Sequence, residues 1–101
     1  MKYVTFSLIG FFLWMAPAHA DTALATSKNC MACHANDKKL VGPSFKDIAV
    51  KYAGDKTAVD KLATKIQKGG AGVWGPVPMP ANTQVSDAEA KKLAAWVLTI
   101  K

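Results

Sequence analysis

Cys30-Met31-Ala32-Cys33-His34 is the stretch around which the rest of this 101-residue chain can be interpreted. Its spacing is Cys-x-x-Cys-His, the attachment signature of c-type haem. Two thiols three residues apart can each add to a vinyl group on one edge of a haem, and the adjacent His34 can then reach the iron as an axial ligand. The motif therefore predicts one haem c, bound covalently through Cys30 and Cys33, with His34 on one face of its iron.

Three other interpretations of the two cysteines are less favoured. A thioredoxin-like redox pair needs a βαβ setting, which the sequence does not indicate. A structural zinc site takes four ligands, whereas only Cys30, Cys33 and His34 stand together here. A plain disulfide would leave a short chain without the large apolar group that its core needs.

The start of the chain has the composition of a secretory signal peptide. Met1-Lys2-Tyr3 carries a positive charge, residues 4–16 are almost wholly apolar, and Ala18 and Ala20 form the small-residue pattern of a cleavage site. The apolar run is shorter than the ~20 residues of a spanning helix, which favours cleavage over an uncleaved membrane anchor. We therefore expect a signal peptide over residues 1–20.

Cleavage after Ala20 would leave residues 21–101 as one domain, secreted into the periplasm without stable insertion in a membrane. Its 81 residues lie close to the limit of ~80 below which a core needs a staple, and a haem would act as that staple. It holds 12 lysines, no arginine and 7 acidic residues, a net charge of +5. The lack of arginine argues against a nucleic-acid partner, and dispersed lysines suit docking to an acidic protein surface.

Apolar side chains recur at helical spacing in three segments after the motif, and no segment alternates as a strand does. A residue that can cap a helix precedes each of these three segments. Another stands at the start of the segment that precedes Cys30, so a helix is expected there too. The expected start signals are Asp21 or Thr22, Ser44, Thr57 with Asp60 at capping-box spacing, and Ser86 with Glu89 at the same spacing. Gly54 and the Gly69-Gly70 pair would stop the second and third helices. The sequence therefore predicts an all-α domain of about four helices wrapped around one haem.

Residues 69–85 carry four glycines and three prolines, which excludes a helix or a central strand. A long irregular loop in a small domain is usually functional, and this one contains Met79. His34 is the one histidine of residues 21–101, and of their two methionines Met31 is fixed between the attachment cysteines. Met79 is therefore the best candidate for the second axial ligand, although a lone methionine is more often core filler.

Together these features resemble the short bacterial class I cytochromes c, of the c-551 type. The matching segments are Cys30–His34, Val41–Pro43, Phe45–Ala49, Tyr52–Gly54, Val73–Pro80 and Ala95–Leu98. Three departures affect loop geometry. Asn29 stands where glycine is expected, although asparagine also tolerates positive φ, Ala81 stands where a second proline is common, and the loop after Asn82 is one residue longer than expected.

The resemblance implies roles around the haem for four further residues. The carbonyl of Pro43 would accept a hydrogen bond from His34 and so fix its tautomer. The indole N–H of Trp74 and the amine of Lys65 would bond a haem propionate, and Asn82 would contact the sulfur of the methionine ligand. Each of the four also has a purely structural interpretation, as a turn, core or solvated residue.

We therefore expect a monomeric periplasmic protein, not an enzyme, that shuttles one electron through a His/Met-ligated haem in respiration or denitrification. Its donor would be a membrane cytochrome complex or a reductase, and its acceptor a nitrite reductase, an oxidase or a peroxidase. The expected docking face is apolar and ringed by lysines such as Lys38 and Lys39; its apolar members are Val41, Val77 and Ala81. The alternative is a haem-based ligand sensor or peroxidase with an open sixth position.

Overall fold

The computed structural model describes Gly10 and residues 18–101. Most of the expected signal peptide therefore lies outside the described residues. Within the described part of the chain, no helix is long and apolar enough to cross a membrane.

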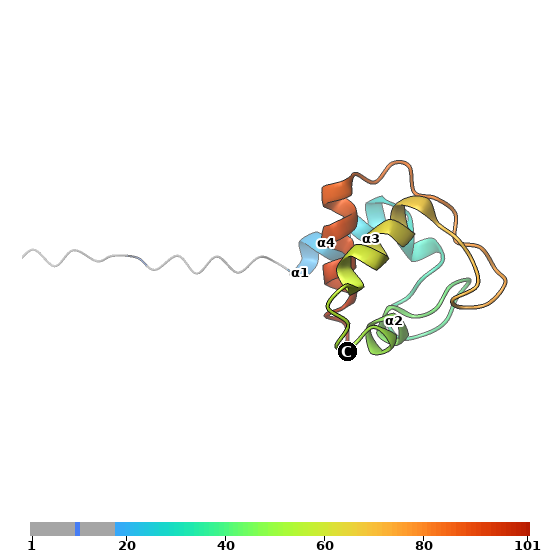
Figure 1. Ribbon diagram of the computed structural model, residues 1–101. Helices are drawn as coiled ribbons and strands as arrows, with labels where there is room; N and C mark the ends of the chain where they lie inside the picture. The colour runs from blue at the N-terminus through green and yellow to red at the C-terminus, as the bar shows by residue number, and fades with distance from the viewer. Residues whose placement is uncertain (1–9, 11–17) are drawn as a thin grey trace, which may run out of the picture.

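Four α-helices and one short 3-10 helix make up the regular structure of the described residues, which contain no strand (Figure 1). The α-helices are α1 (Ala18–Ser27), α2 (Phe45–Lys51), α3 (Ala58–Lys68) and α4 (Asp87–Val97), and the 3-10 helix η1 spans Cys30–Ala32. The expectation of an all-α domain with about four helices is confirmed.

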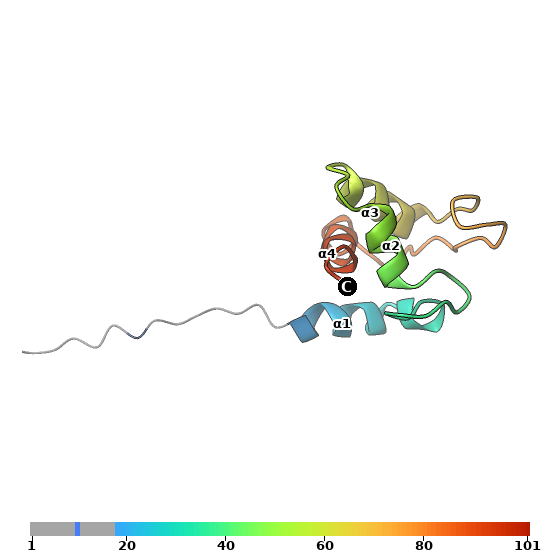
Figure 2. The ribbon, with the colours of Figure 1, turned by 90° about the horizontal axis from the view of Figure 1, so that it is seen from below.

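The C-terminal helix α4 is the one against which the others pack. α1, α2 and α3 each contact it, as two perpendicular views show (Figures 1 and 2). It buries the apolar stripe expected from its sequence: Ala90, Leu93, Ala94 and Val97. Side chains from the other helices and from the end of the long loop complete the core: Ala25, Phe45, Ile48, Leu62, Ala63 and Val85. Removal of these apolar surfaces from water is the main force that holds the helices together.

Two helix starts follow the sequence signals closely. The hydroxyl of Ser44 accepts a hydrogen bond from the amide of Asp47 at 3.0 Å and caps α2. Ser86 and Glu89 form a complete capping box at the start of α4, with each side chain bonded to the other's backbone N–H. At the end of α3, Gly69 adopts φ 67°, which suits glycine.

The expected start of the first helix is wrong. Neither Asp21 nor Thr22 is its cap, because α1 already begins at Ala18. Alanine is the strongest helix former, so the helix continues into the residues before Asp21. Asp21 instead lies in the first turn, where its carboxylate interacts favourably with the positive end of the helix dipole. Its Oδ1 also forms an ion pair with Nζ of Lys92 in α4, at 3.5 Å.

The expected capping box at Thr57 and Asp60 is also wrong. Thr57 precedes α3, but its side chain makes no capping hydrogen bond. Its amide and its hydroxyl both donate to Oδ1 of Asp55, at 2.8 and 2.7 Å, while Lys61 donates to Oδ2 at 3.0 Å. Asp55 thus draws the hydroxyl away from the helix end. These hydrogen bonds, above all the one from the Thr57 hydroxyl, lower the pKa of Asp55 to about 2.

The two longest loops, residues 33–44 and residues 69–86, lie on the same side of the helices (Figures 1 and 2). Asn29, with φ 65°, adopts the left-handed conformation for which asparagine is suited and turns the chain from α1 into η1. The fold thereby brings the Cys30–His34 motif and the loop that contains Met79 to one side of the helical frame.

Candidate functional site

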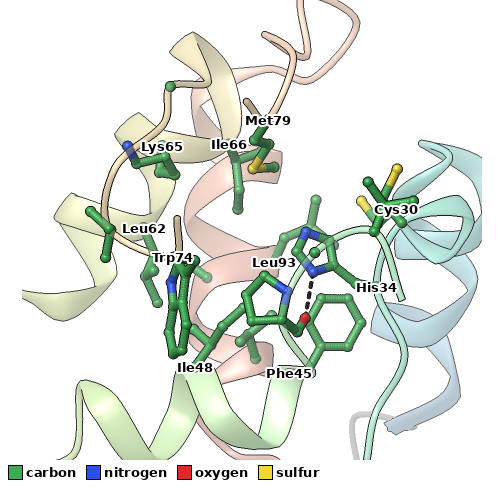
Figure 3. Close-up of a pocket in the computed structure, with 18 of the residues that line it drawn as sticks. Cys30, His34, Phe45, Ile48, Leu62, Lys65, Ile66, Trp74, Met79 and Leu93 are labelled. Atoms are coloured by element: carbon green, nitrogen blue, oxygen red, sulfur yellow. Dashed lines mark hydrogen bonds between the residues drawn. The ribbon is translucent and has the colours of Figure 1, made fainter. Parts of the chain in front are cut away.

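An apolar cavity lies between the helices and the two loops (Figure 3). The space between its walls is about 1070 Å³, part of it open to solvent. Seven of the eight residues expected from the sequence line it: Cys30, Cys33, His34, Pro43, Lys65, Trp74 and Met79. The fold thus gathers into one cavity side chains that are far apart in the sequence.

The two cysteines are free thiols, half-buried at the cavity wall. η1 places them there, because its tight turn bonds the amides of Cys33 and His34 to the carbonyl of Cys30, at 3.2 and 3.0 Å. Burial is the main cause that raises the pKa of the Cys30 thiol. The described residues contain no cluster of three or more His, Cys, Asp and Glu side chains that could hold a bare metal ion.

His34 is buried, with 9% of its surface exposed, and its ring is fixed on two sides. Nδ1 lies 2.7 Å from the carbonyl oxygen of Pro43, and the ring stacks on Phe45 with centroids 5.2 Å apart (Figure 3). A carbonyl oxygen can only accept, so Nδ1 carries the hydrogen, and in the neutral imidazole Nε2 is then the nitrogen with the free lone pair. An imidazole oriented by such a bond is well suited to donate Nε2 to a metal.

Gly42 allows the chain to pass close against this ring. A Cβ atom at position 42 would lie 2.6 Å from Cε1 of His34, closer than any real contact. The Gly42 amide also donates to the carbonyl of Cys33 at 2.8 Å, which holds the loop against the motif. Only glycine fits at this position.

Met79 lies across the cavity from His34, with its sulfur directed into the cavity (Figure 3). Its backbone is paired with Gly70 through two hydrogen bonds, of 3.0 Å from the Gly70 amide and 2.8 Å from the Met79 amide. Gly69 lies so close to the Met79 carbonyl oxygen that a Cβ atom there would collide with it. By contrast, Met31 does not line the cavity and packs against the helical core.

Trp74 and Lys65 lie at the edge of the cavity. The Trp74 ring is 44% exposed, and Nζ of Lys51 lies 5.5 Å from its centroid, within the range of a cation–π contact. Lys65 is half-buried, with its Nζ beside Gly70. An indole N–H and an ammonium group at an otherwise apolar wall are donors suited to a carboxylate, and their contact with a propionate stays a prediction.

Asn82 is the expected site residue that the structure does not bring to the cavity. Its side-chain nitrogen donates to the carbonyl of Ile66 at 2.8 Å and to that of Pro80 at 3.5 Å, and not to the sulfur of Met79. The carbonyl of Ile66, near the end of α3, has no helical partner and attracts the amide. In this structure Asn82 ties the long loop to α3.

The walls of the cavity fit a large, flat, apolar group. Four residues with exposed apolar side chains line it, and they would otherwise face water: Val41, Val73, Trp74 and Val77. Contiguous exposed apolar surface of this kind marks a binding site. With two thiols on the wall and an imidazole and a thioether facing each other, the residues present fit haem c and can hold its iron from both sides.

Sequence reasoning missed how close some residues lie to the expected ligands. These residues are Gly42 and Phe45 beside His34, and Gly69 beside Met79. Nothing in the order of residues says which side chain a glycine faces in space. Their proximity to His34 and Met79 therefore emerges only from the folded chain.

Comparisons with known proteins cover most of the described residues. The family model for cytochrome c matches residues 22–101. Cytochrome c-552 of Hydrogenobacter thermophilus is 61% identical over 82 residues, which cover 81% of this chain and 83% of that protein. Cytochrome c-551 of Azotobacter vinelandii is 59% identical over 78 residues, covering 77% and 94%. The crystal structure of wild-type Nitrosomonas europaea cytochrome c552 superposes with a TM-score of 0.77 at 55% identity, covering 79% of this chain and 99% of that one.

Proposed function

The chain belongs to the cytochrome c family, and we propose that it carries electrons in the periplasm with its haem iron held between His34 and Met79. Its relatives identify it as a monohaem electron carrier and not an enzyme. Its two cysteines, Cys30 and Cys33, account for the covalent attachment of one haem c. The observation that supports the ligand assignment is that the imidazole of His34 and the thioether of Met79 both line the same apolar cavity and lie across it from each other (Figure 3).

When bound, haem c supplies a one-electron couple at its iron. The residues of the chain orient the two side chains that would bind the iron. Nε2 of His34 is aimed by the bond between Nδ1 and Pro43, and the Met79 backbone is held by Gly70. A thioether ligand raises the potential relative to two imidazoles. With the iron held by both side chains, no position would be left for a substrate.

The ligation is tested by the visible spectrum of the purified protein. We expect a low-spin oxidised spectrum with a sulfur-to-iron charge-transfer band, a covalent haem in the pyridine haemochrome assay, and a reduced protein that resists carbon monoxide. A high-spin spectrum that shifts readily with carbon monoxide would favour a ligand sensor or peroxidase with an open sixth position. A haemochrome assay without covalent haem would contradict attachment at Cys30 and Cys33.

We propose that partners dock at the mouth of the cavity. Val41 and Val77 are 57% and 60% exposed there, and Lys38 and Lys39 on the neighbouring loop are exposed. Such a surface suits a small, transient interface with an acidic protein. The proposed donor is a membrane cytochrome complex or a reductase, and the proposed acceptor a nitrite reductase, an oxidase or a peroxidase.

Charge reversal tests this docking face. Lys39→Glu should slow electron transfer to the partner and weaken its dependence on ionic strength, because steering between opposite charges is lost. Lys91→Glu, on the exposed face of α4, makes the same charge change away from the cavity wall and should have a smaller effect. Equal effects of the two variants would contradict the assignment of the face.

We propose that residues 1–20 are removed as a signal peptide and that residues 21–101 are the mature, monomeric periplasmic protein. The support is the charge, apolar run and small-residue pattern of the leader. Fractionation of cells and the intact mass of the haem protein test it. A periplasmic protein that begins at Asp21 is expected, and one that retains Met1 would contradict the proposal.

A further inference from the structure

The hydrogen bonds described above join Met79 and the residues that follow it to α3 and to the residues directly after α3. Met79 pairs with Gly70, directly after α3, and Asn82 bonds through both its backbone amide and its side chain to the carbonyl of Ile66, at 3.2 and 2.8 Å. These bonds fix Met79 relative to α3. They do not fix it relative to Cys30–His34, the segment that carries the other proposed ligand.

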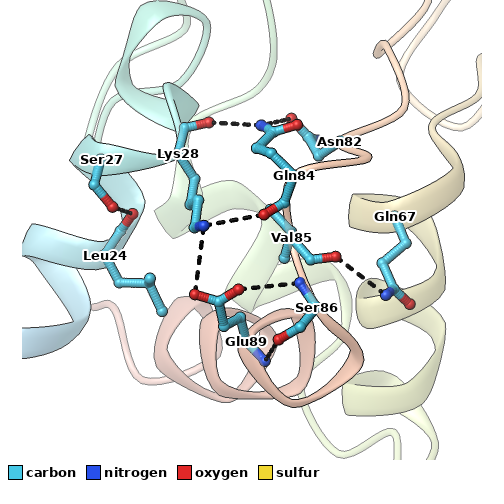
Figure 4. A network of polar contacts seen from close by, with 9 residues as sticks. All are labelled: Leu24, Ser27, Lys28, Gln67, Asn82, Gln84, Val85, Ser86 and Glu89. Carbon is cyan, nitrogen blue, oxygen red and sulfur yellow. Dashed lines mark hydrogen bonds and ion pairs between the residues drawn. The ribbon is translucent and has the colours of Figure 1, made fainter.

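A reciprocal pair of hydrogen bonds, between Lys28 and Gln84, joins the loop to that segment (Figure 4). Lys28 lies two residues before Cys30, and Gln84 lies five residues after Met79. Nζ of Lys28 donates to the backbone carbonyl of Gln84 at 3.0 Å, and Nε2 of Gln84 donates to the backbone carbonyl of Lys28 at 3.3 Å. Each side chain holds the other backbone, so the two segments are joined at two points.

The amide of Gln84 also continues the connection toward α3. The side-chain nitrogen of Gln84 carries two hydrogens. It donates to Oδ1 of Asn82 at 3.2 Å as well as to the backbone carbonyl of Lys28. Asn82 is in turn bonded to Ile66. A series of side-chain hydrogen bonds therefore runs from the end of α1 through Gln84 to the end of α3, along the part of the loop that follows Met79.

Lys28 is itself held in place. Its Nζ forms an ion pair with Oε2 of Glu89 at 3.5 Å, and Oε1 of Glu89 accepts the backbone N–H of Ser86 at 3.1 Å (Figure 4). The amine that donates a hydrogen bond to the loop is therefore also paired with a carboxylate of α4, the central helix. Because this ion pair already restricts the amine, Lys28 loses less side-chain freedom when it donates to Gln84.

We propose that Gln84 is a positioning residue that latches the Met79 loop to the segment carrying His34, and so limits how often the thioether leaves the iron. The latch rests on the His34/Met79 ligation proposed above. Gln84 does not line the cavity, so it acts through the loop and not on the haem. Side-chain hydrogen bonds outside the ligand set thereby control the lifetime of the ligand.

The test replaces the Gln84 amide in the haem-loaded protein. Gln84→Met keeps the length of the side chain but removes its bonds to Lys28 and Asn82. We expect imidazole to displace Met79, seen as loss of the sulfur-to-iron band, at a concentration about fivefold lower, the population change of one net hydrogen bond. Exchange of the Met79 amide hydrogen, which is bonded to Gly70, should accelerate by a similar factor. This second measurement reports the opening of the loop itself, without an added ligand.

Gln67→Met is the matched control. Nε2 of Gln67 also makes two hydrogen bonds, to Asp87 at 2.6 Å and to the carbonyl of Val85 at 3.4 Å, but neither involves Lys28. It removes a bond between α3 and the end of the same loop without touching Lys28, so it should shift imidazole binding and Met79 exchange less than Gln84→Met does. Lys28→Met removes the hydrogen bond from the Lys28 amine to the Gln84 carbonyl and should shift both measurements in the same direction as Gln84→Met.

Equal shifts in Gln84→Met and Gln67→Met would show that the bonds between Gln84 and Lys28 matter no more than another bond of the loop, and would overturn the latch. Unchanged imidazole binding and exchange in Gln84→Met, beside a wild type with a normal sulfur-to-iron band, would also overturn the latch but leave the ligation intact. A wild-type protein without that band would overturn the ligation and the latch together.

Discussion

The imidazole of His34 donates from Nδ1 to the carbonyl oxygen of Pro43 across 2.7 Å. This bond selects one tautomer, because a carbonyl cannot donate in return. Since the ring is buried and stacked on Phe45, the hydrogen on Nδ1 should exchange slowly with solvent. NMR of nitrogen-labelled protein is expected to show a persistent ring N–H signal from Nδ1, and a signal at Nε2 instead would contradict the assigned orientation.

Gly42→Ala should destabilise the protein because its new Cβ would press against Cε1 of His34. Overpacking of this kind costs about 1–3 kcal/mol, which denaturant unfolding of the haem protein can measure. Ala53→Val, at an exposed position after α2, adds two carbon atoms away from the cavity and should change the free energy of unfolding by less than about 0.5 kcal/mol. Equal stability of Gly42→Ala and wild type would mean that the loop does not pack on the ring.

Ser86→Ala should lower the free energy of unfolding by about 1 kcal/mol through loss of the cap of α4. The helix is central to the core, so the loss should affect the whole domain in one cooperative transition. Ser27→Ala is a suitable comparison, because that hydroxyl bonds only to Leu24 within α1 and caps nothing in this way. A smaller effect at Ser86 than at Ser27 would contradict the role of the capping box.

Asp55 should make stability depend on acid pH. Its folded pKa, about 2, lies below the value of about 3.9 expected in the unfolded chain. The contribution of its carboxylate is therefore fully present above about pH 4 and is lost as the pH falls through about 2. The stability difference between wild type and Asp55→Asn should shrink between pH 5 and pH 2. Asp37→Asn, on the exposed loop, controls for the loss of one charge, and a difference that stays constant with pH would refute the prediction.

Sequence reasoning succeeded where the signal is local. Ser44, Ser86 and the apolar stripe of α4 each act within a few residues, and the structure confirms them. It failed at Thr57 because a neighbouring carboxylate, Asp55, competes for the same hydroxyl. It also failed at the start of α1, where the helix extends beyond the residue that could cap it.

The site residues likewise divide into those that a local pattern predicts and those that depend on the folded chain. The motif and the census of histidines and methionines led to Cys30, Cys33, His34 and Met79, and the fold gathers all four at one cavity. The partner of Asn82 could not be predicted, since it depends on where α3 ends relative to the long loop. Likewise, Gly42 is a contact of His34 only because the loop folds back over the motif.

The reduction potential of Met79→Ala, measured together with its visible spectrum, tests the central claim most directly. The haem should stay attached through Cys30 and Cys33, while the sulfur-to-iron band disappears and the sixth position opens to added ligands. Loss of the thioether should lower the potential by on the order of 100 mV, within the ~0.8 V over which axial ligands tune haem iron. A variant whose spectrum and potential match those of wild type would contradict the assignment of Met79, and with it the account of a carrier whose iron is held between His34 and Met79.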